Sequence, residues 1–306
     1  MRVLWLGLVA VGAAACATPA VNFEHQSELA VASRGVALNT EGLDGIVGMF
    51  GTTCRVNVND GSIGEDYNFP TEDEEVVDAA VLYGDNAVLV ISDMGAHVTY
   101  PDRVWDWGTD DFGGPGVLEG GITDDGVAML AGDPCRVDWS SGTDAVSTGV
   151  PADYCAGASF SVDRDDGRVF VANGEVAKVT EEGYETIADG ADLVVWDMEA
   201  QVLYATLVGS STLHGIEADG ALRWTTEVEG AIVSLDVMGM LGQAAVMVEK
   251  ENGAGALLTV DGYTGEITSE LATPSAAEAV ESSDNGKTLA LVLPREVHFF
   301  NVRSAP

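Results

Sequence analysis

Residues 158–187, with the sequence ASFSVDRDDGRVFVANGEVAKVTEEGYETI, decide the fold of this chain. Four short runs rich in Val, Phe, Ile and Tyr are separated by Asp-Asp-Gly, Asn-Gly and Glu-Glu-Gly turns. Such runs fit pleated, half-buried strands, and Asn-Gly supplies the positive φ angles of a two-residue hairpin. We therefore predict strands at 158–162, 168–172, 176–180 and 184–187. Because so short a segment has no room for a crossover helix, the strands must form an antiparallel meander.

The meander repeats along the chain. Glycines of the first and third turns are 16 residues apart in three places, Gly167 and Gly183, Gly126 and Gly142, Gly45 and Gly61. Third turns then follow at steps of 37 to 45 residues, at Gly61, 101–102, Gly142, Gly183, Gly220 and Gly265. A repeat of this length indicates a ring or an array of similar small sheets.

The two ends of the chain complement each other. A seventh unit runs through 287–293 and 296–302, but the chain stops at Pro306, where its outer strand is due. Residues 28–32 form a spare strand before the first unit begins at Gly35. An N-terminal strand that completes the last sheet closes the ring and removes the open edge. We therefore predict an all-β fold, a seven-bladed β-propeller of four-stranded antiparallel blades, in a single domain at 28–306.

Several units resemble known propeller repeats. Residues 283–290, SDNGKTLA, resemble the S-x-D-G-K-x-L-x motif of YVTN and WD40-type blades. Residues 261–266, DGYTGE, resemble the D-x-x-T-G turn of quinoprotein-like repeats, and 219–224 are a partial copy. The resemblance covers roughly 28–303 and implies the shape. It implies no activity, since the dipeptide Trp196-Asp197 follows an inner strand and has no Gly-His partner.

The start of the chain resembles the signal peptide of a bacterial lipoprotein. After Arg2 come 13 uncharged, mostly apolar residues, fewer than the roughly 20 needed to span a bilayer. Residues 13–16, AAAC, are similar to a lipobox, whose Cys is acylated and becomes the mature N-terminus. We predict a signal peptide at 1–16, lipidation of Cys16 and a flexible tether at 17–27. The resemblance implies an outer-membrane address in the cell envelope, because Ala17 and not Asp follows the Cys; an ordinary secretory leader is the alternative.

Three cysteines remain after Cys16. Cys54 and Cys135 occupy equivalent strands two blades apart, so they are not expected to reach each other. Cys135 and Cys155 flank the passage from the third blade to the fourth, and an oxidising envelope favours a disulfide between them. Cys54 is then expected to be a free, buried thiol.

The chain is strongly acidic. It has 13 Lys and Arg against 50 Asp and Glu, a formal net charge of −37. This charge argues against nucleic acid and against adsorption to anionic headgroups, because both need basic patches. Membrane contact is therefore expected through the lipid anchor only, and the favoured partners are cationic proteins, divalent cations or neutral sugars. The acids lie in nearly every turn, however, so general solubility or adaptation to high salt is an alternative.

No catalytic or cofactor motif is visible. The four histidines lie far apart in the sequence, and 286–288, GKT, lacks the first glycine of a phosphate loop. Residues 163–167, DRDDG, resemble half of a calcium loop, but Gly174 stands where the closing Glu is required. Asp-rich turns are also usual in hairpins. We predict no catalytic residue, no cofactor and no metal, with calcium at this turn as the alternative.

One stretch is a candidate ligand-binding rim. In 104–114, VWDWGTDDFGG, Trp105 and Trp107 share one face of the second blade's outer strand. A Gly-rich acidic loop with Asp110, Asp111 and Phe112 follows. Aromatic rings beside carboxylates can stack on a sugar or hold a basic side chain. Packing of the tryptophans between blades is the alternative.

These observations favour a binding module over an enzyme. A rigid disc with variable loops suits recognition of protein or glycan partners in the cell envelope, and no catalysis is needed to explain the sequence. The alternative is a metal-dependent hydrolase or another enzyme, with polar residues from several inner strands converging in the axial channel. The sequence does not indicate an oligomeric state.

Overall fold

The computed structural model describes residues 20–30, 35–38, 44–49, 52–66, 76–81, 88–92, 95–100, 103–108, 117–123, 126–141, 144–157, 159–283 and 285–304. Within these ranges the chain is built of strands, with two short 3-10 turns, η1 (Ala152–Cys155) and η2 (Gly239–Leu241). None of the described segments is a helix with the length and apolarity needed to cross a bilayer.

The strands form seven four-stranded antiparallel sheets, numbered here as blades in chain order. Blade 1 consists of β2 (Gly35–Leu38), β3 (Asp44–Met49), β4 (Thr52–Asn57) and β5 (Ile63–Asp66). Blade 2 consists of β6 (Val76–Val81), β7 (Val88–Ser92), β8 (Gly95–Tyr100) and β9 (Arg103–Gly108). Blade 3 consists of β10 (Val117–Thr123), β11 (Gly126–Gly132), β12 (Cys135–Ser141) and β13 (Asp144–Gly149). Blade 4 consists of β14 (Ser159–Asp163), β15 (Arg168–Ala172), β16 (Glu175–Thr180) and β17 (Gly183–Asp189). Blade 5 consists of β18 (Leu193–Asp197), β19 (Val202–Thr206), β20 (Thr212–Ile216) and β21 (Leu222–Glu227). Blade 6 consists of β22 (Ala231–Val237), β23 (Gln243–Glu249), β24 (Gly255–Asp261) and β25 (Ile267–Thr273). Blade 7 consists of β26 (Ala279–Ser282), β27 (Thr288–Leu293), β28 (Glu296–Ser304) and, as its outer strand, β1 (Val21–Leu29).

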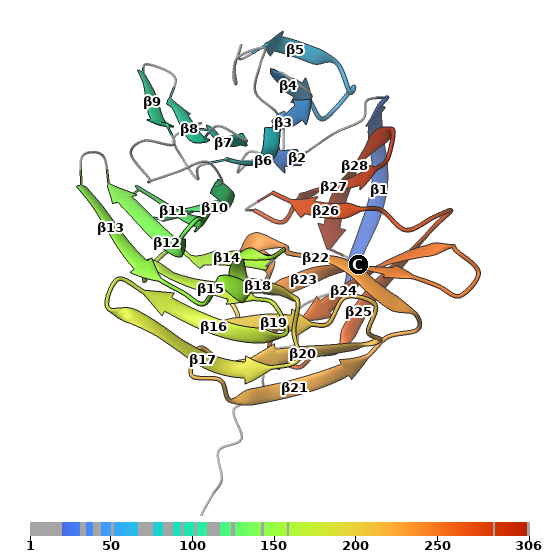
Figure 1. Ribbon diagram of the computed structural model, residues 1–306. Helices are drawn as coiled ribbons and strands as arrows, with labels where there is room; N and C mark the ends of the chain where they lie inside the picture. Colours follow the sequence, from blue (N-terminus) through green and yellow to red (C-terminus); the bar gives the residue numbers. More distant parts are fainter. Residues whose placement is uncertain are drawn as a thin grey trace, which may run out of the picture.

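The seven sheets are arranged in a closed ring (Figure 1). The first strand of each blade contacts the first strand of the next, from β2 through β6, β10, β14, β18 and β22 to β26 and back to β2. The turns that the 16-residue spacing marked all join consecutive antiparallel strands. The predicted all-β, seven-bladed propeller is therefore confirmed.

Strand β1 closes the ring, as predicted, but it lies earlier in the sequence than predicted. It pairs antiparallel with β28, with Val21 opposite Ser304 and Leu29 opposite Val297 (Figure 1). The flexible tether predicted at 17–27 is thus wrong for residues 21–27, which belong to β1, and the strand predicted at 28–32 overlaps β1 only at Glu28 and Leu29. Val21 and Leu29 are buried in two different core clusters, and this burial selects the longer strand.

Side-chain contacts connect β1 to both neighbouring blades. At its start, the Val21 amide donates to the Ser269 hydroxyl of blade 6 over 2.8 Å, and that hydroxyl donates back to the Val21 carbonyl over 2.7 Å. Towards its end, the Ser27 hydroxyl donates to the carbonyl of Val58 in blade 1. Gly61 packs so close to the main chain of Glu28 that a side chain there would collide with the Glu28 carbonyl oxygen. The closing strand therefore bridges blades 6, 7 and 1.

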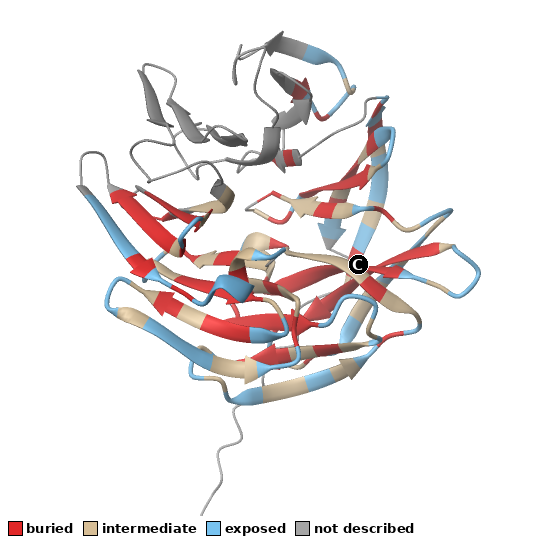
Figure 2. Ribbon diagram, viewed as in Figure 1, coloured by how far each residue is buried: buried red, intermediate tan, exposed pale blue. Residues whose placement is uncertain are grey.

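The core lies between adjacent blades. In blades 3 to 7, the second and third strands are mostly buried, whereas the outer strands β13, β17, β21 and β25 alternate with exposed residues (Figure 2). Tryptophans tie neighbouring blades together. The indole of Trp139 donates to the Gly167 carbonyl over 2.7 Å, and that of Trp224 donates to the Gly262 carbonyl over 2.8 Å. The Trp224 ring packs directly against Gly215, where any larger residue would collide with the ring.

The ring has two faces. Because alternate strands of a blade run in the same direction, the turn from the first to the second strand and the turn from the third to the fourth strand lie on the same face of the ring. We call this face the turn face. The opposite face, the connection face, carries the second-to-third turns and the links between blades. Since Val21 pairs with Ser304, at the end of a third strand, β1 begins at the turn face.

Candidate functional site

Two large apolar side chains are exposed on two turns of blade 6, both on the turn face. Met240, in η2 of blade 6, is 60% exposed, and Tyr263, in the last turn of the same blade, is 37% exposed. Exposed Glu199 and Gln201 lie in the neighbouring turn of blade 5. We call these four residues the blade 5–6 surface. An apolar pair beside a carboxylate is suited to a partner with both apolar and cationic groups.

Hydrogen bonds within and between the two blades fix the turns of this surface, and that of Tyr263 crosses from blade 6 to blade 5. The Tyr263 hydroxyl donates to the Glu199 carbonyl over 2.9 Å, and the Gly262 amide donates to the Gly242 carbonyl over 2.9 Å. Arg223 donates to the carbonyls of Ala200 and Gln201 over 2.7 and 2.9 Å. A surface held in this way loses little conformational entropy when it binds.

The backbone of Gln201 is unusual. Its φ of 51° is the one left-handed value of a non-glycine residue among those described. L-residues rarely adopt this conformation, because Cβ approaches the following carbonyl. The two hydrogen bonds from Arg223 to this turn help to hold it. Backbone strain of this kind is concentrated at functional turns in proteins, which directs attention to this surface.

A buried carboxylate supports the blade 5 turn from below. Asp197 is fully buried; it accepts the Ala200 amide over 2.9 Å and the Tyr204 hydroxyl over 3.2 Å. Burial raises the pKa of Asp197 from 3.8 to about 6, and burial also raises the pKa of Tyr204. In blade 6, Asp261 accepts the amides of Tyr263 and Thr264 in the same manner. These buried acids shape turns.

The predicted ligand rim is only partly described by the structure. Trp105 and Trp107 lie in β9, the outer strand of blade 2, where their main chains pair with Val98 and Ala96 of β8. Their side chains, and the residues Asp110, Asp111 and Phe112, lie outside the described part of the chain. The rim therefore stays a prediction.

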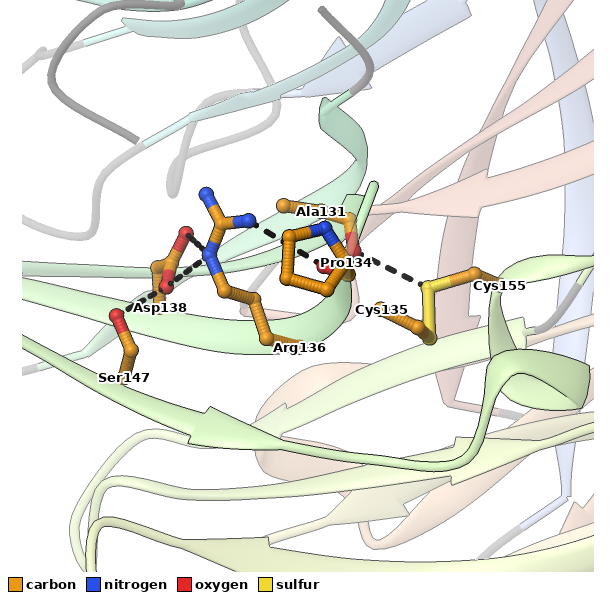
Figure 3. Close-up of polar contacts among 7 residues, drawn as sticks. All are labelled: Ala131, Pro134, Cys135, Arg136, Asp138, Ser147 and Cys155. Carbon is orange, nitrogen blue, oxygen red and sulfur yellow. Dashed lines mark hydrogen bonds and ion pairs between the residues drawn. A yellow bond between two sulfur atoms is a disulfide. The ribbon is translucent and has the colours of Figure 1, made fainter. Parts of the chain in front are cut away.

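The predicted disulfide between Cys135 and Cys155 is present, with the two Cα atoms 5.8 Å apart (Figure 3). It joins the start of β12 to η1, on the connection face. Next to it in blade 3, Arg136 binds both oxygens of buried Asp138 at 2.9 Å, and the Ser147 hydroxyl donates to the same carboxylate over 2.5 Å. This group holds the outer strand β13 on β12. Cys16 lies outside the described residues, and Cys54 lies in β4, the strand equivalent to β12.

The Asp-rich turn at 163–167 is a hairpin turn between β14 and β15. The Asp163 carboxylate binds the Arg168 Nε over 2.6 Å, and Asp166 binds the same guanidinium over 2.5 Å. These two carboxylates therefore already have a cationic partner within the chain. The calcium alternative remains untested.

One group of metal-ligand side chains was missed by sequence reasoning. His25 and Glu28 of β1 and His298 of β28 each offer one ligand atom, and the three atoms lie within 4.8 Å of one another. No other group of three or more such ligands meets this criterion in the described residues. The two histidines are 273 residues apart in the sequence, so only the closure of the ring brings them together.

Comparisons with known proteins show the fold alone. No family of known proteins matches the chain, and no curated protein matches it by sequence. Among solved structures, a chain of the mitotic checkpoint complex superposes with a TM-score of 0.69 at 11% identity, covering 98% of this chain and 98% of that one. Virginiamycin B lyase from Staphylococcus aureus superposes with a TM-score of 0.67 at 13% identity, covering 92% of this chain and 99% of the lyase.

Proposed function

We propose that this chain is a lipid-anchored scaffold of the bacterial cell envelope that holds a basic protein partner on its blade 5–6 surface. The observation that carries the proposal is the exposure of Met240 and Tyr263 on turns of blade 6 that are hydrogen-bonded to each other and, through Tyr263, to blade 5. A rigid apolar anchor surrounded by polar residues is the usual centre of a protein interface.

The charge of the chain defines the chemistry of the partner. With a net charge of −37, the scaffold attracts cationic surfaces and repels acidic ones. Exposed Glu199 is hydrogen-bonded to Tyr263 through its carbonyl, so a Lys or Arg of the partner can pair with its carboxylate while an apolar side chain covers Met240. A mitotic checkpoint protein with the same fold acts within a multi-protein complex, which supports a protein partner.

The short N-terminal link limits the distance between disc and membrane. If Cys16 carries the lipid, five residue steps join it to Val21, which span at most roughly 18 Å. Val21 lies at the turn face, the same face that carries the blade 5–6 surface. We therefore expect a partner that itself lies close to the membrane.

The rival function is an enzyme, and one observation favours it: virginiamycin B lyase has the same fold. Such an enzyme needs polar groups that converge on a substrate. In the described blades, buried Asp138, Asp163 and Asp197 bind Arg136, Arg168 and the blade 5 turn, respectively. These contacts occupy the carboxylates with structural roles, so the scaffold is the better supported function.

A positive charge introduced at the blade 5–6 surface tests the proposal. Met240→Lys places a cation against a basic partner, so crosslinked protein recovered from intact envelopes should fall at least about tenfold, which corresponds to about 1.4 kcal/mol. Val208→Lys is the matched control, because Val208 is 57% exposed in the turn between β19 and β20, on the opposite, connection face. Met240→Leu should retain binding.

Each outcome of this experiment is informative. Equal recovery with Met240→Lys and Val208→Lys would exclude the blade 5–6 surface. Crosslinks to carbohydrate in place of protein would overturn the protein partner and favour a glycan. Loss of capture with Trp105→Ala and Trp107→Ala, but not with Met240→Lys, would move the binding site to the rim of blade 2.

A further inference from the structure

The seam between β1 and β28 brings imidazole and carboxylate groups together. In the paired strands, Glu28 lies opposite His298 and His25 lies opposite Phe300. The register shifts between His25 and Ser27, which marks Gln26 as a bulged residue. In a regular strand, residues 25 and 28 would point to opposite faces. The extra residue places both His25 and Glu28 on the face that carries His298.

The ligand atoms are already spaced for a metal ion. The Nε2 of His25 lies 3.2 Å from the Nδ1 of His298, and a Glu28 carboxylate oxygen completes a group within 4.8 Å. Two nitrogens bound tetrahedrally to zinc at about 2.0–2.1 Å are roughly 3.4 Å apart. An ion can therefore bind between the two rings with side-chain adjustment alone.

A second carboxylate orients one of the rings. The Nε2 of His298 lies 3.1 Å from the Oε1 of Glu296. Because an ionised carboxylate only accepts hydrogen bonds, Nε2 carries the hydrogen and the lone pair of the neutral ring is on Nδ1. That lone pair faces His25 and Glu28. A carboxylate that fixes the tautomer of a ligating histidine is the usual support of a protein metal site.

We propose that His25, Glu28 and His298 bind one divalent transition-metal ion, with zinc as the physiological candidate, across the seam that closes the ring. Two imidazoles favour zinc, copper or nickel over calcium and magnesium, which prefer oxygen ligands. His25 and Glu28 are exposed, so water can take the fourth position. Because its ligands come from both β1 and β28, the ion would clamp the closing strand to the last blade.

The proposal is tested by zinc titration of the purified full-length protein in a calorimeter. Excess Mg²⁺ should be present, since it saturates weak binding to the many surface acids. We expect one Zn²⁺ per chain and a higher melting temperature with zinc. His25→Ala and Glu28→Gln should each weaken zinc binding at least about tenfold, and Glu296→Gln by roughly 10- to 100-fold. His214→Ala is the matched control, because His214 lies on the equivalent third strand of blade 5.

Several results would overturn the site. One is a titration in Mg²⁺ that shows no one-to-one binding of zinc. Another is an equal zinc affinity of Glu28→Gln and His214→Ala. Glu28→Gln keeps the shape of the side chain, so it decides the matter even if His25→Ala fails to fold. Bound Co²⁺ supplies a second readout: intense visible absorption is expected in the parent protein and in His214→Ala, and its persistence in His25→Ala would also exclude these ligands.

Discussion

At the scale of single residues, buried carboxylates do structural work in this chain. Asp138 and Asp163 each bind an arginine, whereas Asp197 has hydrogen bonds to the Ala200 amide and the Tyr204 hydroxyl. Hydrogen bonds compensate only part of the cost of burying a charge. The pKa of Asp197 is consequently raised to about 6, with burial as the main cause.

This raised pKa predicts a pH-dependent stability. A carboxyl whose pKa is higher in the folded protein stabilises the fold below its unfolded pKa, and this contribution disappears as the pH rises through the folded value. For Asp197 the window runs from 3.8 to about 6, and the change amounts to at most about 3 kcal/mol. The Asn side chain of Asp197→Asn does not titrate. The free energy of unfolding of this variant, relative to that of the parent, should therefore increase as the pH is raised from about 4 to about 8.

Denaturant unfolding of both proteins across this pH range measures the effect. Asp219→Asn is the control, because Asp219 is exposed in the same blade and its substitution removes the same charge as Asp197→Asn. Its difference from the parent protein should change much less with pH. A constant difference between Asp197→Asn and the parent would show that the buried carboxyl is not neutralised near pH 6, the approximate value given by its burial.

At the scale of strands and blades, local turn chemistry determined how well the sequence could be interpreted. β15, at Arg168–Ala172, was predicted with its observed bounds, because the turns on both sides contain Gly167 and Gly174 at positive φ. The closing strand was misplaced because no turn connects β1 to its partner. Its register depends on burial of Val21 and Leu29 by residues distant in the sequence. Local signals do not report such contacts.

The closing strand should contribute strongly to stability. Deleting Val21–Leu29 exposes the edge of β28 and the cores that Val21 and Leu29 cover, so the free energy of unfolding should fall by at least about 3 kcal/mol. An exposed strand edge also favours association between chains. Deleting residues 17–20 is the control, since it leaves β1 intact. Thermal unfolding and light scattering of both deletions test this. Equal melting temperatures would mean that β1 does not close the ring in solution.

At the scale of the whole molecule, ring closure creates features that no single segment encodes. The Glu28 and His298 pair requires residues from both ends of the chain, and the blade 5–6 surface requires turns from two blades. The repeat predicted the number of blades because spacing is a property of the sequence. It could not predict either site, because a site depends on which side chains of different blades lie next to each other.

The membrane anchor is the last feature that belongs to the whole molecule. We expect Cys16→Ser to release the protein from the membrane fraction, because two or three acyl chains at one Cys provide firm anchoring. The disc should remain folded, with an unchanged melting temperature, since Cys16 precedes the first residue of β1 by five positions. Cys54→Ser is the control for loss of a thiol, and it should stay in the membrane fraction. Membrane association of Cys16→Ser equal to that of the parent protein would exclude the lipid anchor. The acidic disc would then need another attachment, because its charge disfavours binding to anionic headgroups.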